Sequence, residues 1–335
     1  MRRSTVRYAI WVTIGMLSVG AGHDFNTITD VSQQVPTKGC LDSLSTCCVG
    51  KWLSDATWSV ACDEARNLVF LGSADSVYVL DCSSPADTIV LLSSIPTQDC
   101  ASALFYDPQT SHLYIGERLA GISIWDITQS AAPTELGRFD TPGCACGLYA
   151  AGSHLFVADG DGGLRIIDIR LPSDPGEVGY CLLPCACDVF VHASYAYVVA
   201  EGLEIIDVET PAHPQKVAYW DSPAVIHDVF VVHPYVYAAD DWGGLRVVDI
   251  SKPTAPHEVG HYETEGYAWA VSVINPYAYV AADHAGLRIL DVSDPSKPRE
   301  VGYYETPGDA VNVAVLGSDI LITDLRYGLR IYRKD

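Results

Sequence analysis

The stretch Gly163-Leu164-Arg165-Ile166-Ile167-Asp168-Ile169 decides the fold, because the same phrase recurs along the chain. Clear copies begin at Gly202 (GLEIIDV), Gly244 (GLRVVDI), Gly286 (GLRILDV) and Gly328 (GLRIYR), and weaker copies begin at Gly121 (GISIWDI) and Ser76 (SVYVLDC). Successive copies start 45, 42, 39, 42, 42 and 42 residues apart. A period near 40 residues suits one four-stranded blade. The seven copies therefore predict an all-β fold, a seven-bladed β-propeller.

The unit that spans residues 228–264 shows the strand order expected within each blade. Apolar, β-branched stretches at 228–232, 235–239 and 244–250 are separated by short turns, and a more polar strand follows at 257–264. The turn at 251–256 is rich in proline, which removes backbone donors and ends a strand. Hydrophobicity falls from the first strand to the fourth. We therefore expect the first strand at the axis of the ring and the fourth at its rim.

The two ends of the repeat region predict how the ring closes. The last unit stops at Asp335 after its third strand, and Arg333 replaces the Asp of the other copies. Ahead of the first unit, Val49-Gly50-Lys51-Trp52 resembles fourth-strand phrases such as Val259-Gly260-His261-Tyr262. An N-terminal strand is therefore expected to complete the last blade, which leaves no open sheet edge between the first and last blades.

The N-terminus has the pattern of a targeting segment. Arg2, Arg3 and Arg7 precede an uncharged apolar run at 8–22, which predicts a secretory signal peptide over residues 1–22. The run is shorter than the ~20 residues of a membrane span, so no span is expected after signal removal; an uncleaved anchor is the alternative. Residues 23–48 are expected to form a linker, and 49–335 the propeller. The chain is therefore expected outside the cytoplasm, secreted or at the cell surface.

Charge and cysteine content narrow the classes of partner. The chain has 42 acidic against 20 basic residues, a formal net charge of −22. This charge repels phosphate backbones and argues against nucleic acid as a partner. Eleven cysteines in an exported chain predict disulfide bonds. Because eleven is odd, at least one thiol would be free, metal-bound or paired between chains.

One face of the ring is expected to carry the function. The turns between second and third strands, and the connections from a fourth strand to the next blade, fall on the same face of an antiparallel blade. We call this the upper face, and the opposite one the lower face. Cys144-Ala145-Cys146 and Cys185-Ala186-Cys187 occupy equivalent upper-face connections in successive units. Cys100 matches Cys144 one unit earlier, and His227 takes the place of Cys187 one unit later.

Three interpretations of these cysteines stay open. Thiolate and imidazole ligands suit zinc or copper, which gives a speculative metal site made of Cys144, Cys146, Cys185, Cys187 and His227. The second interpretation is structural disulfides between neighbouring blades, formed from Cys100, Cys144, Cys146, Cys185 and Cys187. The third is redox-active thiols. A Cys-X-Cys pair in an extended strand is expected to be poorly placed for a disulfide of its own.

Acidic residues also recur on the upper face, after the second strand of each unit. They are Glu117, Asp159, Asp161, Glu201, Asp240, Asp241, Asp283 and Asp324. Asp159-Gly160-Asp161-Gly162-Gly163 superficially resembles a calcium loop, since calcium prefers several oxygen ligands, but it lacks the rest of that pattern. The alternative is that Asp and Gly simply form turns. The repeated third-strand Asp lies toward the lower face and is expected to bond local backbone amides.

Large aromatic residues are expected on the upper face as well. They are Trp58, Trp242, Tyr267 and Trp269, and with Asp159 and Asp161 they form a speculative binding face. Such side chains stack on sugars or grip a partner's side chain. The alternative is that they pack against adjacent blades.

The repeated strand, Leu203-Glu204-Ile205-Ile206-Asp207 and its equivalents, together with the proline-rich turn, resembles the LVIVD-repeat family of extracellular β-propellers. The resemblance covers about residues 50–335. It implies a secreted or surface-displayed propeller, often a binding or scaffold module, and carries no catalytic motif. The sequence itself has no G-x-S-x-G, Walker loop or H-E-x-x-H pattern.

A non-catalytic propeller that binds a protein or a surface glycan is therefore the leading hypothesis. No cofactor is expected apart from zinc, copper or calcium at the sites above. The alternatives are a metal-binding propeller and a hydrolase or lyase that uses upper-face carboxylates with His227. The sequence predicts no oligomeric state.

Overall fold

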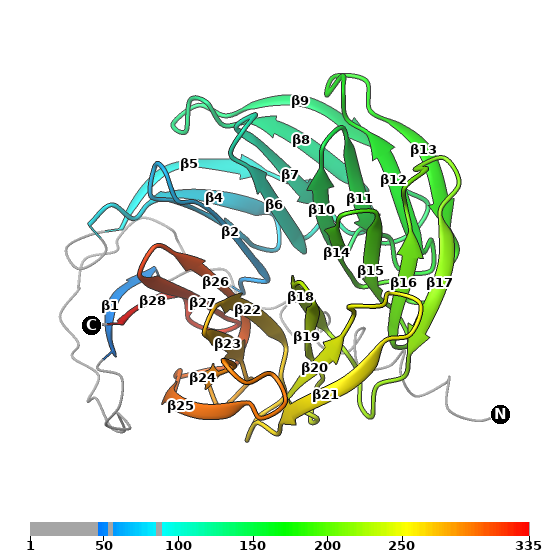
Figure 1. The fold of residues 1–335 in the computed structure, drawn as a ribbon. Coiled ribbons are helices and arrows are strands. Elements are labelled where there is room, and N and C mark those ends of the chain that lie inside the picture. Colours follow the sequence, from blue (N-terminus) through cyan, green and yellow to red (C-terminus); the bar gives the residue numbers. More distant parts are fainter. Residues whose placement is uncertain (1–45, 53–55, 85–88, 335) are drawn as a thin grey trace. The chain divides into compact units, whose positions relative to one another are not determined.

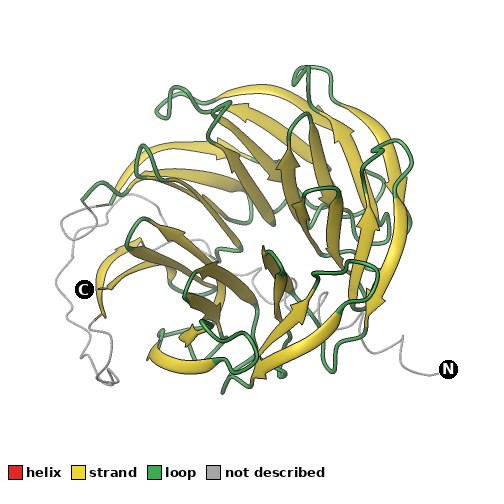
Figure 2. Cartoon of the chain, in the orientation of Figure 1, coloured by secondary structure: helices red, strands yellow, loops and turns green. Residues whose placement is uncertain are grey.

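A computed structural model describes residues 46–52, 56–84 and 89–334, so the predicted signal peptide and most of the predicted linker lie outside the described residues. This part of the chain forms 28 β-strands in seven four-stranded sheets, and every strand pairing is antiparallel. Figure 2 shows strands and loops alone in the described ranges. The predicted seven-bladed β-propeller is confirmed.

The first three blades follow the chain in order. Blade 1 consists of β2 (Ser59–Asp63), β3 (Leu68–Gly72), β4 (Ser76–Asp81) and β5 (Val90–Pro96). Blade 2 consists of β6 (Ala103–Asp107), β7 (His112–Gly116), β8 (Ile122–Asp126) and β9 (Thr134–Phe139). Blade 3 consists of β10 (Gly147–Ala151), β11 (His154–Ala158), β12 (Leu164–Asp168) and β13 (Gly176–Cys181).

The next three blades repeat the pattern, and the last one draws on both ends of the chain. Blade 4 consists of β14 (Asp188–His192), β15 (Tyr195–Val199), β16 (Leu203–Asp207) and β17 (Gln215–Trp220). Blade 5 consists of β18 (Asp228–Val232), β19 (Tyr235–Ala239), β20 (Leu245–Asp249) and β21 (His257–Tyr262). Blade 6 consists of β22 (Ala270–Ile274), β23 (Tyr277–Ala281), β24 (Leu287–Asp291) and β25 (Arg299–Tyr304). Blade 7 consists of β26 (Ala310–Leu316), β27 (Asp319–Asp324), β28 (Gly328–Lys334) and β1 (Thr46–Trp52).

The ring closes as the chain ends predict. The first strands of the blades contact one another in the order β2, β6, β10, β14, β18, β22 and β26, and β26 contacts β2. Figure 1 shows β1 beside β28, and the two pair from Thr46 with Lys334 to Trp52 with Leu329. The closing strand begins at Thr46, ahead of the predicted Val49. Arg333, which departs from the repeated Asp, pairs with Asp319 at 2.6 Å.

Burial does not fall in the order that the hydrophobic gradient suggested. The first strand does lie at the axis, yet β18 alternates half-buried and buried side chains, whereas four of the five residues of β19 are buried. First strands border the central channel, while second and third strands pack against the neighbouring blade. In one such layer Tyr237 and Val247 of blade 5 pack with Val271 and Val280 of blade 6.

Aromatic rings from four successive first strands form a row. Ring centroids lie 5.0 Å apart for Phe105 and Tyr149, 4.5 Å for Tyr149 and Phe190, and 5.3 Å for Phe190 and Phe230. Contacts of this length between tilted rings are favourable. They hold the first strands of blades 2 to 5 together where the ring is narrowest.

The repeated third-strand Asp has the structural role that the sequence predicts. Asp249 accepts a hydrogen bond from the Ser251 backbone N–H at 2.7 Å, and this bond fixes the first step of the proline-rich turn. The same bond, to the residue two positions on, is made by Asp81, Asp126, Asp168, Asp207 and Asp291.

Ion pairs between third and fourth strands recur in the blades, with one reversal. The third-strand Arg pairs with a fourth-strand Glu in three blades, as Arg165–Glu177 (3.3 Å), Arg246–Glu258 (3.4 Å) and Arg288–Glu300 (3.4 Å). In blade 4 the same two positions hold Glu204 and Lys216, 2.7 Å apart. The signs are exchanged, yet opposite charges still face each other.

Restoring the common arrangement in blade 4 tests this pair. Glu204→Arg alone is expected to lower the free energy of unfolding by about 1–3 kcal/mol, because a second cation would meet Lys216 at a buried position. Adding Lys216→Glu is expected to recover most of that loss, since it recreates the pair of the other blades. Urea unfolding of the four members of this double-mutant cycle measures the coupling. Equal losses in the single and double variants would contradict the pairing.

Candidate functional site

The two kinds of upper-face segment are joined by backbone hydrogen bonds. Isolated bridges pair the turn after a second strand with the connection into the next blade, at Arg118 with Ala145, Gly160 with Ala186, Asp241 with Ala268, and Asp283 with Ala310. For example, the Ala145 N–H donates to the Arg118 carbonyl at 2.9 Å. The predicted grouping of turns and connections on one face is therefore confirmed, and each bridge fixes residues of two blades side by side.

Several large apolar side chains are exposed on this face. Trp242 is 61% exposed and Tyr267 is 49% exposed; they flank the bridge between Asp241 and Ala268. Leu119 (73%) and Leu182 (67%) are also exposed in upper-face segments. Water-exposed side chains of this size on one face form a candidate contact surface.

The other two predicted aromatics are not displayed in this way. Trp58 and Trp269 are half-buried, and the Trp269 ring lies 4.2 Å from the His227 ring. His227 Nε2 also lies 3.7 Å from Asp241 Oδ1. Trp269 therefore packs against a ring of the preceding connection, while Trp242 and Tyr267 are the exposed members of the candidate binding face.

The two acids of the calcium-like turn lie in different environments. The Asp159 side chain is fully buried, accepts the Gly143 backbone N–H at 2.8 Å and lies 3.8 Å from Arg165 Nε. Burial raises the pKa of Asp159. Asp161 is exposed and lies 3.7 Å from the Cys185 sulfur. The interpretation of Asp159 as a binding-face residue is corrected: its carboxylate faces N–H donors and supports the turn from inside.

Other turn acids share this inward role. Asp240 is buried, accepts from the Ser222 hydroxyl and lies 3.1 Å from Arg246 Nε. Glu117 is buried and accepts from Arg138 at 2.9 Å. The sequence predicts that the Asp and Glu residues after a second strand are exposed on the upper face. These side chains instead turn into the blade, where they pair with cations of the third and fourth strands.

The Cys-Ala-Cys segment of blade 3 brings two thiols together. The Cys146 thiol donates a hydrogen bond to the Cys144 sulfur, with 3.2 Å between the sulfur atoms. No disulfide joins the two thiols, and the residue between them, Ala145, forms an isolated β-bridge with Arg118. The expectation that this pair is poorly placed for a disulfide of its own stays a prediction.

The equivalent segment of blade 4 is arranged differently. Cys185 has a positive φ of 52° and is exposed beside Asp161. Cys187 is half-buried, with its sulfur 4.0 Å from the carbonyls of Ile226 and His227. No disulfide joins Cys100, Cys144, Cys146 or Cys187. Within residues 46–52, 56–84 and 89–334, no three His, Cys, Asp or Glu side chains gather closely enough to hold a metal ion.

The electrostatics of the cysteines separate Cys144 from its neighbours. The hydrogen bond from Cys146, together with the Arg118 guanidinium, lowers the pKa of Cys144 to about 7. The same bond, with burial, raises the pKa of Cys146. Burial raises the pKa of Cys100 to about 11 and also raises that of Cys187. Cys144 is therefore more readily ionised than Cys100, Cys146 and Cys187.

Comparison with known proteins identifies the repeats. The model of the LVIVD repeat matches residues 142–182, 185–221, 226–264 and 265–306, which are blades 3 to 6 with the connections that enter them. Blades 3 to 6 are therefore LVIVD repeats. This confirms the family resemblance of their third strands.

A solved structure is similar in fold to this protein. It is the crystal structure of the computationally designed Ika8 protein, with a TM-score of 0.61 and 10% sequence identity. The match covers 85% of this chain and 98% of that one, and at this identity it shows the fold alone. No curated protein matches the sequence. In the ranges that the structure describes, no helix is long and apolar enough to cross a membrane.

A pair of carboxyl groups in the ring was missed by the sequence analysis. Asp188 and Asp228 begin the first strands of blades 4 and 5, and the Asp188 carboxyl group adds to burial in raising the pKa of Asp228. Asp188 accepts the Val229 N–H at 3.0 Å, and Asp228 accepts the Val271 N–H at 2.7 Å. Burial raises the pKa of both. An Asp at the start of two apolar strands, one unit apart, was the available signal.

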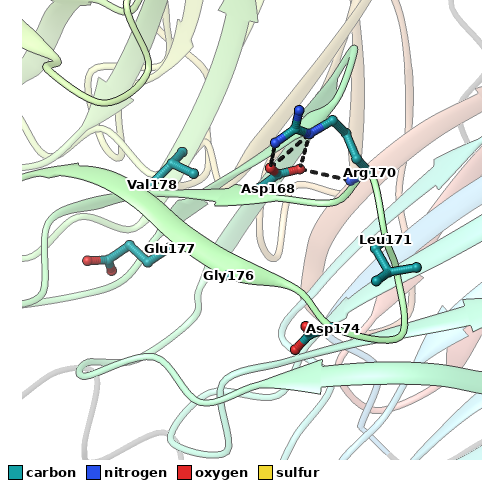
Figure 3. A pocket seen from close by; sticks show the side chains of 7 residues that line it. All are labelled: Asp168, Arg170, Leu171, Asp174, Gly176, Glu177 and Val178. Carbon is teal, nitrogen blue, oxygen red and sulfur yellow. Dashed lines mark hydrogen bonds and ion pairs between the residues drawn. The ribbon is translucent and has the colours of Figure 1, made fainter.

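Two surface hollows lie away from the upper face. One of about 440 Å³ is formed by the turn from β12 to β13, where Figure 3 shows Arg170 paired with Asp168 and Leu171 beside them. Arg170 lowers the pKa of Asp168 to about 2. A second hollow of about 270 Å³ lies at the equivalent turn of blade 6, around Asp291 and Arg299. Because the same place is hollow in two repeats, it is a property of the proline-rich turn.

Proposed function

We propose that this protein is a secreted or cell-surface propeller that has no catalytic role and binds a partner protein through its upper face. The observation that carries the proposal is the exposure of Trp242 and Tyr267, with Leu119 and Leu182, in the short segments of that face. Tyr and Trp are enriched among residues that dominate protein interfaces. The strongly negative net charge favours a partner with a basic surface.

The binding role is tested by comparing two double variants. Trp242→Ala with Tyr267→Ala removes the aromatic pair of the upper face. Leu171→Ala with Ile274→Ala removes two side chains of the lower face that are 58% and 49% exposed. A partner captured by the wild-type chain is purified and titrated against each protein. The upper-face variant is expected to weaken its Kd at least about 30-fold, and the lower-face variant less than about threefold.

Two outcomes would contradict the proposal. One is a partner whose affinity falls in the lower-face variant and not in the upper-face one. The other is selective binding to a glycan array that Trp242→Ala abolishes without a change in Tm, which would replace the protein partner with a sugar. The expected location is tested separately, by the intact mass of the exported chain, which should begin after residue 22.

A further inference from the structure

The Cys144-Ala145-Cys146 segment is held from both sides by backbone hydrogen bonds. The Ala145 N–H donates to Arg118 of blade 2 at 2.9 Å, and the Cys146 N–H donates to Ala158 of its own blade at 2.9 Å. The Cys144 N–H donates to Asp159 at 3.2 Å. These bonds fix the backbone so that both thiols stay on one side of the segment, with their sulfur atoms 3.2 Å apart.

From this separation, the two sulfur atoms need to move only a short distance to form a disulfide bond. An S–S bond is about 2.05 Å long, so the two sulfur atoms need to approach by about 1 Å, which small side-chain rotations supply. The loop that such a bond closes has a single residue between its cysteines. Very short loops gain little from restricting the unfolded chain. A disulfide bond between Cys144 and Cys146 is therefore poorly suited to stabilise the fold and well suited to be reduced and formed again.

The surroundings assign different roles to the two thiols. The Arg118 backbone is bridged to Ala145, the residue after Cys144. The Arg118 guanidinium contributes to lowering the pKa of Cys144, because a cation beside a cysteine favours the nucleophilic thiolate. Cys146 donates its proton toward Cys144 and so is the group that acts second. Both residues are half-buried, and Leu119, next to Arg118, is 73% exposed. An incoming molecule thus has an apolar contact beside the nucleophile.

Blade 4 supplies an internal comparison with the same Cys-Ala-Cys sequence. The group beside Cys185 is the Asp161 carboxylate, 3.7 Å from its sulfur, where blade 3 places the Arg118 cation beside Cys144. An anion opposes thiolate formation. The sequence of the segment is therefore not sufficient, and the residue of the facing turn makes the difference.

We propose that Cys144 and Cys146 form a reversible dithiol–disulfide couple that exchanges electrons with the disulfides of other molecules. This activity is separate from partner binding by Trp242 and Tyr267 and does not depend on it.

The exchange is balanced as two substitutions at sulfur. The Cys144 thiolate attacks one sulfur of a disulfide R–S–S–R′, forms the mixed disulfide Cys144–S–S–R and releases R′–S⁻, which takes a proton from solvent. Cys146 then loses its proton to solvent and attacks the Cys144 sulfur, which releases R–S⁻ as the second thiol. The dithiol gives up two electrons and two protons, and the substrate disulfide becomes two thiols. The reverse reaction oxidises a dithiol substrate.

The test uses the full exported chain and oxidised glutathione as the disulfide. The chain is reduced with dithiothreitol, freed of it, exposed to oxidised glutathione, trapped with N-ethylmaleimide and digested for mass spectrometry. The wild type is expected to show an internal Cys144–Cys146 disulfide that dithiothreitol reverses. Cys146→Ser is expected to accumulate glutathione on Cys144, because the second step is lost. Cys144→Ser is expected to react at least about tenfold more slowly.

Matched variants separate this role from general thiol reactivity. Cys185→Ser with Cys187→Ser is expected to leave the reaction unchanged, and Arg118→Gln is expected to slow it about three- to tenfold without a change in Tm. Failure of Cys146→Ser to hold glutathione on Cys144 would overturn the proposal. So would a Cys144–Cys146 bond that resists dithiothreitol, or stoichiometric zinc or copper in the exported chain that shields both thiols until a chelator removes it. Loss of partner binding in the Trp242→Ala variant tests the binding role alone.

Discussion

A chain that starts after Trp52 is expected to lose most of its folding stability. The deletion removes β1, which pairs with six of the seven residues of β28, and with it the packing of Val49 and Trp52 against the layer that contains Leu329 and Ile331. A fully buried side chain of this size contributes about 1.5–3 kcal/mol; these two are half-buried, and six residue pairs of the ladder are lost as well. A loss of more than about 5 kcal/mol is expected, comparable with the whole stability of many proteins.

The deletion also exposes β28 as an unpaired edge. Such edges pair with other chains, so the shortened protein is expected to elute as oligomers or to precipitate. A chain that starts at Thr46 is the control, because it keeps the whole of β1. Thermal unfolding and size-exclusion chromatography compare the two proteins. A shortened chain that stays monomeric with the Tm of the control would show that β1 does not close the ring.

Gly244→Ala is expected to be strongly destabilising. Gly244 has a φ of +72°, and a Cβ at this position would lie 2.2 Å from the Tyr262 carbonyl oxygen and 2.6 Å from the Thr264 nitrogen. Left-handed backbone costs a residue with a side chain about 1–2 kcal/mol, and overpacking costs about 1–3 kcal/mol more. A loss of about 3–5 kcal/mol in the free energy of unfolding is therefore expected, measured by urea unfolding.

Two other glycines separate the two contributions. Gly152 has a φ of +60° with open space around the added Cβ, so Gly152→Ala is expected to show the backbone cost alone, about 1–2 kcal/mol. Gly176 also has open space and lacks a positive φ, so Gly176→Ala is expected to stay within about 0.5 kcal/mol of the wild type. If Gly244→Ala loses no more stability than Gly152→Ala, the close contact between the added Cβ and the end of the fourth strand does not contribute to the free energy of unfolding.

Most of the fold could be predicted from the sequence repeat. The predicted strands of the fifth blade, 228–232 and 235–239, coincide with β18 and β19, because apolar, β-branched stretches and the turns between them are local signals. Closure by the N-terminal strand was predicted from Val49-Gly50-Lys51-Trp52, which resembles the fourth strands of the other units. The burial of the first strands could not be predicted from the repeat. It depends on the width of the central channel, which the whole ring determines.

The candidate site was less visible in the sequence. The upper face was located correctly, yet the inward turn of Asp159 and the approach of Cys144 to Cys146 depend on side-chain orientations that composition does not encode. The interaction between Asp188 and Asp228 joins residues of two blades, and it needs the spacing between blades to be known. Side-chain chemistry that arises between repeats is therefore harder to predict than the repeat itself.

The charge pairs between third and fourth strands have a consequence for the evolution of the ring. Both members of each pair belong to one blade, as in Arg246 with Glu258 and in Glu204 with Lys216. When a gene segment that encodes one blade is duplicated, lost or shuffled, both members of the ion pair move together. No charged residue is then left without its partner in a neighbouring blade. Blade 4, with its exchanged signs, shows that one module can diverge without a compensating change in the next.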